Sequence, residues 1–404
     1  MLKEFRVSNF KSLLNVEFRP VGLNLIVGAN NAGKTNLCHA LRFLGLTSLM
    51  PLEQAAYQCT AEPWNLLNVY APDEFMEMEV HDQLCLRDYA QEESLEFTYN
   101  LKIRRKGTRS KLLASPFTVA SECLKVSGQH FGNNKMLLEN KEGLVKLLHE
   151  RRFLKQEAWG PEYVETTAPT ETTMLFRLYD LETNQRASLF KRYLNSWAYY
   201  NFDVAQLRSN TARPMDRVLA SNGSNLCSVI YTFHNERPRD ERKLVEMVKT
   251  LEPRLDLISF QSPDPEHIYM FFEDKQGNRF GVQNVSDGTL RFLAISYLII
   301  SNRREKSASE PVPLIIIEEP ENGVYVGYMK ALFEKIDPSG EQGQFIFTSH
   351  NPYFIDLFDA ILEGIHLVKM LGTYSSVTRP DPARIQEGLG KFSLGEMHFR
   401  GLLE

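Results

Sequence analysis

The segment Gly28–Thr35, with the sequence GANNAGKT, has a glycine, lysine and threonine at every fixed position of a phosphate-binding loop. The glycines allow backbone N–H groups to turn inward around phosphate oxygens. Lys34 can reach the β- and γ-phosphates, and the Thr35 hydroxyl can ligate Mg²⁺. The sequence therefore predicts a nucleoside triphosphate and Mg²⁺ as ligands. The residues expected to contact the nucleotide are Gly28, Asn30, Asn31, Ala32, Gly33, Lys34, Thr35 and Asn36.

Two adjacent carboxylates follow the apolar run Leu314–Ile317. Strands of a parallel sheet deliver such residues to their carboxyl edge, where ligands collect in open α/β folds. We interpret Glu318 as the carboxylate on the metal side and Glu319 as the base that activates the attacking water. A solvated strand end is the alternative, and the phosphate loop upstream favours the catalytic interpretation.

Two further features become informative through their order in the chain. The turn Ser286–Gly288 precedes an apolar helical pattern, and His350 follows the strand-like run Phe345–Thr348. Taken alone, Ser286 would be a helix N-cap and His350 a structural residue at a strand end.

Alternating strand and helix patterns at both ends of the chain position these residues. Leu23–Val27 leads into the phosphate loop, which a helix over about 34–44 follows. Near the other end, strands at 313–317 and 344–347 alternate with a helix over about 325–335. This order predicts an α/β fold, a P-loop core with a mixed, largely parallel sheet and flanking helices.

The middle of the chain has a different pattern. Strand-like runs at 74–80 and 94–103 indicate an antiparallel β lobe, and 140–200 has a mainly helical pattern. We therefore expect one core that is built from both ends of the chain. The predicted units are the N-terminal part of the core (1–73), the antiparallel β lobe (74–135), a mainly helical insertion (136–215) and the C-terminal part of the core (216–404).

Composition narrows the remaining possibilities. The 46 basic and 51 acidic residues among 404 give a net charge of −5, which argues against a surface coated with positive charge for nucleic-acid binding. The five cysteines are scattered without a C-x-x-C pair, so neither a disulfide framework nor a thiolate zinc site is indicated. Apolar runs fall far short of the ~20 residues of a membrane span. We expect a cytoplasmic protein without a membrane partner.

Together, the four motifs resemble the SMC/RecF/OLD-like branch of the ABC-type ATPases. The segments Val7–Ser12, Asn222–Leu226, Glu318–Gly323 and Ser393–Glu396 are similar to that branch as well. The resemblance implies an ABC-type core that hydrolyses ATP. Ser286 and Gly288 would then form a signature turn that contacts the γ-phosphate held by the other subunit of a dimer. His350 would sense that phosphate, and the catalytic residues would be Lys34, Glu319 and His350.

The chain departs from the family pattern in two places. Relatives commonly have His-Pro after the E-N-G segment, where this chain has Val324–Val326. The glutamine that senses Mg²⁺ in relatives has no clear counterpart, and Gln83 and Gln91 are weak candidates.

The resemblance implies a homodimer or higher oligomer that ATP closes around two composite sites. By analogy, the chain would be the sensor or regulator ATPase of a bacterial anti-phage defence system, acting through a separate effector, a nuclease or a toxin. One alternative is a RecF-like ATPase that binds DNA in repair, and another is a nucleotide-gated scaffold with little turnover. DNA contact would use a run of cations. A solvated hairpin tip would explain the same run of cations equally well. These cations are Lys102, Arg104, Arg105, Lys106, Arg109 and Lys111.

Overall fold

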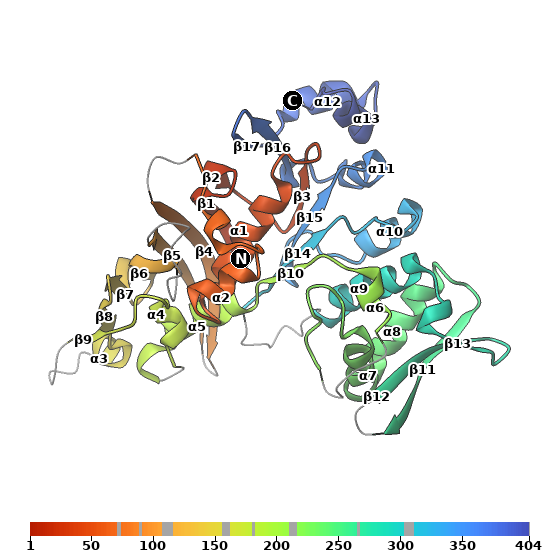
Figure 1. Cartoon of the computed structure of the whole chain (residues 1–404), viewed down its shortest axis with the longest axis horizontal. Helices are drawn as coiled ribbons and strands as arrows, with labels where there is room; N and C mark the ends of the chain where they lie inside the picture. Colours follow the sequence, from red (N-terminus) through yellow and green to blue (C-terminus); the bar gives the residue numbers. More distant parts are fainter. Residues whose placement is uncertain are drawn as a thin grey trace.

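The computed structural model describes residues 1–70, 74–88, 91–106, 116–155, 162–179, 182–209, 216–264, 267–302 and 311–403. Within these residues a mixed sheet of 14 strands runs through the molecule, in the order β10-β14-β15-β3-β16-β17-β2-β1-β4-β5-β6-β7-β8-β9. A second sheet has the order β11-β12-β13. The phosphate loop and the carboxylate strand lie in the central part of the molecule, toward the β10 end of the large sheet (Figure 1).

Parallel pairing defines that central part. β14 (Leu314–Glu318) pairs with β15 (Gln344–Ser349), which pairs with β3 (Leu23–Val27), and β16 (Ile365–Leu371) pairs with the other side of β3. The short strand β10 (Ala198–Tyr200) adds a parallel edge beside β14. Strands from the two ends of the chain therefore interleave, which confirms the predicted α/β fold with its largely parallel core.

Helices cover both faces of the central strands, which explains why their sequences are almost continuously apolar. Ile316 and Ile346 belong to the same apolar core as helix α1 (Lys34–Thr47). Their neighbours Ile315 and Phe347 belong to a second core with helix α9 (Asp287–Ser301). Because successive side chains of a strand point to opposite faces, the sheet separates these two cores.

Beyond β16 the sheet continues with antiparallel pairing, except between β17 and β2, which are parallel at one residue pair. The strands of this lobe are β1 (Leu2–Phe10), β2 (Leu13–Phe18), β17 (Tyr374–Thr378), β4 (Phe75–Asp88), β5 (Gln91–Arg105), β6 (Phe117–Gly128), β7 (Gly132–Lys141), β8 (Leu144–Leu148) and β9 (Tyr163–Thr167). Helix α5 (Gln185–Asn195) packs on them, and the ring of Phe190 stacks on Phe97 at 5.4 Å between centroids. Three short helices lie beside this lobe, namely α2 (Leu52–Tyr57), α3 (Glu150–Lys155) and α4 (Met174–Arg177) (Figure 1).

The prediction of a mainly helical segment over 136–215 is wrong where β7, β8 and β9 lie. β8 has alternating exposed and buried residues, and it pairs with β7 and β9, so the lobe sheet extends to Thr167. The short helix α3 lies between β8 and β9, and α4, α5 and α6 (Val204–Leu207) follow beyond Thr167. The division of the chain at 73, 135 and 215 stays a prediction.

The remaining elements surround the carboxyl edge of the central strands. α7 (Leu226–Glu236) and α8 (Pro238–Lys249) pack beside α9 and the small sheet of β11 (Leu255–Asp264), β12 (His267–Asp274) and β13 (Arg279–Gly281). α10 (Val326–Phe333), α11 (Pro352–Ile355), α12 (Pro382–Leu389) and α13 (Leu394–Phe399) follow toward the C-terminus (Figure 1). No helix in the described parts of the chain has the length and apolar character needed to cross a membrane.

Candidate nucleotide site

The phosphate loop connects β3 to α1 as the sequence predicts. Asn31 and Gly33 have positive φ angles of 63° and 108°, which turns the loop tightly before α1 begins at Lys34. Lys34 Nζ donates hydrogen bonds to the carbonyl oxygens of Gly28 at 2.7 Å and Ala29 at 3.1 Å. Burial lowers the pKa of Lys34, while the nearby carboxylates of Glu319 and Glu318 act to raise it. The ammonium group thus lies across its own loop and within the field of both predicted carboxylates.

Two serines from distant segments, together with Asn36 of α1, hold the loop in this shape. Ser375 Oγ donates to the carbonyl oxygen of Ala32 at 2.7 Å and lies 2.7 Å from Ser12 Oγ. Asn36 Nδ2 donates to the same Ser12 oxygen at 2.8 Å. The side chain of Asn36, which we predicted to contact the nucleotide, therefore fastens α1 to the turn after β1. Ser12 lies in the segment that resembles the family, whereas Ser375 carries no local sequence signal.

Glu318 ends β14 with only 8% of its surface exposed. Asn201 Nδ2 donates to its Oε2 at 3.4 Å, whereas Oε1 is buried without a hydrogen-bond partner. Burial raises the pKa of Glu318, and the hydroxyls of Thr35 and Tyr199 and the thiol of Cys38 lie beside the carboxyl and act to lower it. An unpartnered buried carboxylate oxygen next to a threonine hydroxyl fits a hard cation such as Mg²⁺, which takes oxygen ligands.

Glu319 has an unusual backbone and two side-chain partners. Its φ is +43°, a left-handed conformation, and its N–H donates to the carbonyl oxygen of Thr348 at 3.1 Å. Its Oε1 lies 3.1 Å from Nδ1 of His350, and its Oε2 accepts a hydrogen bond from Asn322 Nδ2 at 2.6 Å. The predicted base and the predicted γ-phosphate sensor are therefore in direct contact.

Glu321 is a third carboxylate in this cluster, which the sequence analysis quoted but did not assign to the site. The residue is 5% exposed, its Oε1 is hydrogen-bonded to the Ser349 hydroxyl, and its Oε2 has no hydrogen-bond partner. Burial raises its pKa, and Glu319 acts in the same direction. Glu321 thus connects the segment after β14 to the end of β15, one residue before His350.

The signature turn Ser286–Gly288 lies at the start of α9. Ser286 Oγ accepts a hydrogen bond from the Thr289 N–H at 3.1 Å, so Ser286 is the N-cap of the helix. Arg208 fixes the approach to the turn, because its guanidinium donates to the carbonyl oxygens of Val282 at 2.6 Å and Val285 at 2.8 Å.

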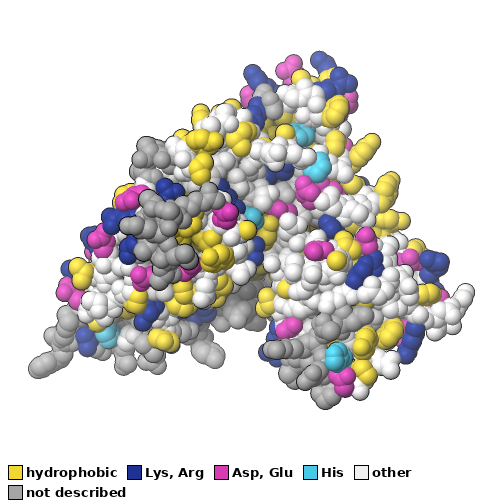
Figure 2. Space-filling view, in the orientation of Figure 1, with side chains coloured by type: hydrophobic (Ala, Val, Ile, Leu, Met, Phe, Trp, Pro, Cys, Tyr) yellow, Lys and Arg dark blue, Asp and Glu magenta, His cyan; other side chains and the backbone are white. Residues whose placement is uncertain are grey.

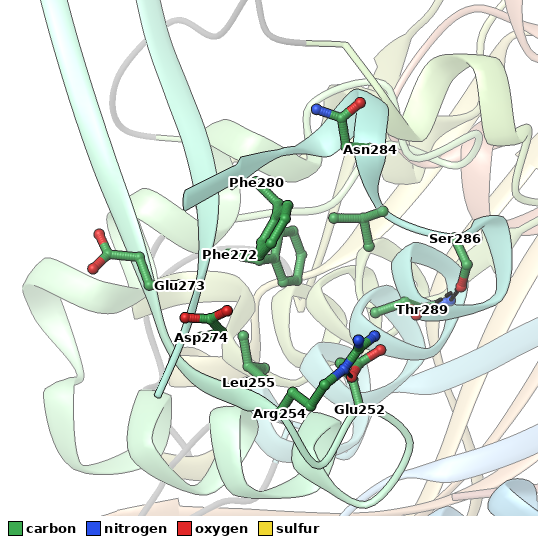
Figure 3. A pocket seen from close by; sticks show the side chains of 11 residues that line it. Glu252, Arg254, Leu255, Phe272, Glu273, Asp274, Phe280, Asn284, Ser286 and Thr289 are labelled. Atoms are coloured by element: carbon green, nitrogen blue, oxygen red, sulfur yellow. Dashed lines mark hydrogen bonds and ion pairs between the residues drawn. The ribbon is translucent and has the colours of Figure 1, made fainter. Parts of the chain in front are cut away.

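Separate hollows border the turn and the phosphate loop. A pocket of about 210 Å³ with Phe272 and Phe280 in its wall adjoins Ser286 (Figure 3). A cleft of about 800 Å³ is lined by the phosphate loop, His350 and Phe399 of α13. The two hollows share no lining residue among those described.

The structure thus brings some of the predicted site residues together and leaves others apart. Lys34, Thr35, Glu318, Glu319 and His350 converge at one edge of the sheet, although the sequence separates them by up to about 300 residues. Ser286 and Gly288 border a separate hollow, although the backbone of Gly288 lies against Gly323 in the segment after Glu319. The catalytic and binding roles of all these residues stay predictions.

Gln83 is a wrong candidate for the Mg²⁺-sensing glutamine. Its N–H bonds to the carbonyl oxygen of Met1, and its side chain donates to Ser94 at 3.1 Å. Met1 lies at the opposite end of β1 from Ser12, which at about 3.3 Å per residue is roughly 30 Å away. Gln91 is the first residue of β5, and its backbone pairs with Asp88. This pair lies closer to the tip of the β4–β5 hairpin than Gln83 does.

The sequence also missed Tyr199 and Asn201. Both come from β10 or its end, and they reach Glu318 only because β10 pairs with β14. A three-residue strand gives no periodicity that could predict this pairing.

Comparisons with known proteins identify a family and a fold. The family profile described as "AAA domain, putative AbiEii toxin, Type IV TA system" matches residues 155–356, half of the chain. A search of the curated proteins finds no significant match.

Solved structures of SMC head domains have a similar fold. An SMC head bound to the C-terminal winged-helix domain of ScpA superposes with a TM-score of 0.52 at 12% identity, over 93% of this chain and 97% of that one. An SMC head with an extended coiled coil, bound to the C-terminal domain of ScpA from Pyrococcus furiosus, gives 0.50 at 11% identity, over 96% and 98%. These structures confirm the predicted SMC-type core at the level of the fold.

Proposed function

Because the chain belongs to this AbiEii-type AAA domain family and has the fold of an SMC head, we propose that it is an ATP-dependent switch protein. It binds ATP and Mg²⁺ in the cleft beside the phosphate loop, closes as a homodimer and reopens after hydrolysis. The observation that carries this proposal is the convergence of Lys34, Glu318, Glu319 and His350 at one sheet edge.

Each residue of this cluster has its own role in the proposed hydrolysis. Lys34 leaves the carbonyl oxygens of its loop to bind the β- and γ-phosphates. Glu319 accepts a proton from the water that attacks the γ-phosphorus, and His350 contacts the γ-phosphate. The oxygens of Thr35 and Glu318 would hold Mg²⁺, which when bound neutralises charge on the phosphates. Energetically, ATP shifts the population toward the closed dimer by contacts that the open state lacks.

A second copy is needed because the signature turn and the phosphate loop border different hollows of one chain. In the closed dimer, Ser286 and Gly288 of each chain would complete the site of the other. The N-terminal end of α9 carries backbone N–H groups and a positive dipole, which suit a phosphate. Residues 287–301 give this helix enough length for a full dipole.

The output of the switch would pass through a separate protein. SMC heads of the same fold have been solved in complex with ScpA domains, so a protein partner is a reasonable extension to this chain. We propose that this cytoplasmic ATPase regulates an effector, a nuclease or a toxin, in a bacterial anti-phage defence system. The family description, which names a toxin of a toxin–antitoxin system, supports this direction.

The cations proposed for DNA contact give the RecF-like alternative less support. Arg104 lies 2.9 Å from Glu142 and 3.7 Å from Glu74, and Lys102 lies 4.0 Å from Glu77. On the face shown in Figure 2, basic and acidic side chains are interspersed. Arg109 and Lys111 lie outside the described residues.

The test compares ATP turnover and ATP binding in the purified chain with Mg²⁺. Lys34→Ala should lose nucleotide binding. Glu319→Gln should keep it but hydrolyse roughly 10²- to 10⁴-fold more slowly, because only the general base is removed. Glu387→Gln, an exposed position on α12, is the matched control.

The proposal fails if Glu319→Gln turns over ATP at the rate of the parent chain. A partner that co-purifies with Glu319→Gln in ATP, but not with Lys34→Ala, would identify the effector.

A further inference from the structure

We propose that Lys11, His39 and Tyr199 form a directed chain of hydrogen bonds that fixes the orientation of the Glu318 carboxylate. His39 and Tyr199 are thereby positioning residues for the Mg²⁺ site. The inference rests on the proposed function, in which Glu318 holds Mg²⁺, and it adds the groups that stand behind this carboxylate. The chain of hydrogen bonds starts in the turn between β1 and β2, crosses α1 and ends on β10.

The side chains of this hydrogen-bonded chain follow one another in space. Lys11 Nζ lies 2.7 Å from Nδ1 of His39 and also donates to the carbonyl oxygen of Cys59 at 2.8 Å. Nε2 of His39 lies 3.3 Å from the hydroxyl oxygen of Tyr199. That hydroxyl lies beside the carboxyl of Glu318. Three segments that are far apart in the sequence therefore lead to one carboxylate.

The proton positions follow from the donor at the start. An ammonium group has only N–H donors, so Nδ1 of His39 accepts and the ring proton lies on Nε2. Burial lowers the pKa of His39 to about 3, and the charges of Lys11 and Arg42 act in the same direction, so the ring carries one proton. Nε2–H donates to Tyr199, whose own proton is left for Glu318. With the other tautomer, the tyrosine would donate to His39 and turn an oxygen lone pair toward the carboxylate.

Two residues of α1 hold the ring of Tyr199 in place. The guanidinium of Arg42 lies 4.7 Å from the centre of the ring, and the imidazole of His39 meets the ring edge-on at 5.3 Å between centroids. The backbone of Tyr199 pairs with Ile316, where β10 runs beside β14. The hydroxyl therefore has a fixed place beside the strand that ends in Glu318.

The chain of hydrogen bonds leaves lone pairs of Glu318 for a cation. Asn201 donates to Oε2 at 3.4 Å, whereas Oε1 is buried without a bond of standard geometry. A carboxylate offers about four lone-pair sites, and the donors Tyr199 and Asn201 use at most two of them. Hydrogen bonds of this kind orient metal ligands, and their loss typically lowers metal affinity roughly 10- to 100-fold. The hydroxyl of Tyr199 is thus expected to contribute to cation affinity without touching the cation.

The experiment measures the affinity of the full chain for Mn²⁺ in the presence of ADP. Mn²⁺ replaces Mg²⁺ because its free concentration can be read by electron paramagnetic resonance. Tyr199→Phe should weaken Mn²⁺ binding by about tenfold or more, and His39→Leu by a similar factor. Because the two residues act in series, the double variant should bind Mn²⁺ no more weakly than Tyr199→Phe alone. His39→Gln, whose amide can accept from Lys11 and donate to Tyr199, should bind Mn²⁺ within about threefold of the parent.

Tyr200→Phe is the matched control, because it removes a tyrosine hydroxyl from the next residue of β10, on the opposite face of the sheet. It should leave the Mn²⁺ affinity unchanged. A Tyr199→Phe variant with the Mn²⁺ affinity of the parent, or a double variant in which the two effects add, overturns the hydrogen-bonded chain alone. A parent that binds neither ADP nor Mn²⁺ overturns the proposed function and the hydrogen-bonded chain together.

Discussion

Gly33→Ala is a substitution for which the structure predicts a large change in the phosphate loop. Gly33 has a φ of +108°, which an L-residue adopts at a cost of about 1–2 kcal/mol. The new Cβ would also lie 2.1 Å from Ser375 Oγ and 2.9 Å from Ser375 Cβ. Rotation of the hydroxyl cannot relieve the second contact, so the serine itself has to move.

Displacing Ser375 breaks two hydrogen bonds, one to the carbonyl oxygen of Ala32 and one to Ser12 Oγ, both 2.7 Å long. At about 1 kcal/mol for each bond, the loss is about 2 kcal/mol. Gly33→Ala should therefore lower the free energy of unfolding by about 3–4 kcal/mol. Ser375→Gly should lower it by about 2–3 kcal/mol, since it loses the same bonds and places a glycine in β17.

The double variant makes the reasoning testable. Because the two hydrogen bonds can be lost only once, the double variant should be more stable than the sum of the single effects predicts, by about 2 kcal/mol. The assay is urea unfolding of the nucleotide-free parent, both single variants and the double variant under one set of conditions. Effects that add to within about 0.5 kcal/mol would refute the structural link between Gly33 and Ser375.

Two further predictions concern buried titratable groups. Glu318→Gln should raise the Mg²⁺ concentration for half-maximal ATP turnover by at least about tenfold. The variant should nevertheless melt at the same or a higher temperature than the parent, because burial raises the pKa of Glu318 and makes its ionised form costly. A lower melting temperature at pH 8 would contradict the stability argument. Burial lowers the pKa of His366 to about 3, so below pH 6.5 only the unfolded chain takes up this proton and stability falls as the pH falls. Between pH 6.5 and 5 the loss is about 2 kcal/mol, and His366→Gln should remove it from urea unfolding measured at both pH values.

The central strands could be predicted because they are buried on both faces. In β3 and β15 every residue is buried, and in β14 the apolar run ends directly in Glu318. Such apolar runs can be recognised as strands without knowing which strands they pair with. The phosphate loop between β3 and α1 has its own local sequence pattern. Because parallel strands bring their carboxyl ends to one edge of the sheet, the motifs that follow these strands are expected together at that edge.

The lobe and the small sheet could not be predicted to the same extent. β9, with the sequence YVETT, is exposed at four of five positions, and β13 has three residues. Such segments become strands because a neighbour offers hydrogen bonds, and strand formation depends more on context than on composition. For the same reason the contacts of Tyr199 with the site, which depend on the pairing of β10, were not predictable.

The contact of Ser375 with the phosphate loop shows the same limit at the level of one side chain. It lies 343 residues from Ala32, on a strand that pairs with β2 at a single residue pair. Nothing in the local sequence YSSVT distinguishes this serine from its neighbour. Only the strand order places one of the two hydroxyls against the loop.

The strand order also explains how one site can be split by a long insertion. β14 and β15 from the C-terminal half lie on one side of β3, and β16 and β17 separate β3 from β2. The buried side chain of Gln344 joins the halves, since its amide donates to the carbonyl oxygens of Leu2 at 2.9 Å and Val21 at 2.8 Å.

The entropic cost of closing such a loop grows only slowly with its length, so the insertion adds little to the cost of bringing the ends together. The pairing must nevertheless be complete before Lys34 and Glu318 share a site. Under the proposed function, ATP and Mg²⁺ would therefore bind only the fully paired core. By mass action their binding would stabilise this core against separation of the two ends of the chain.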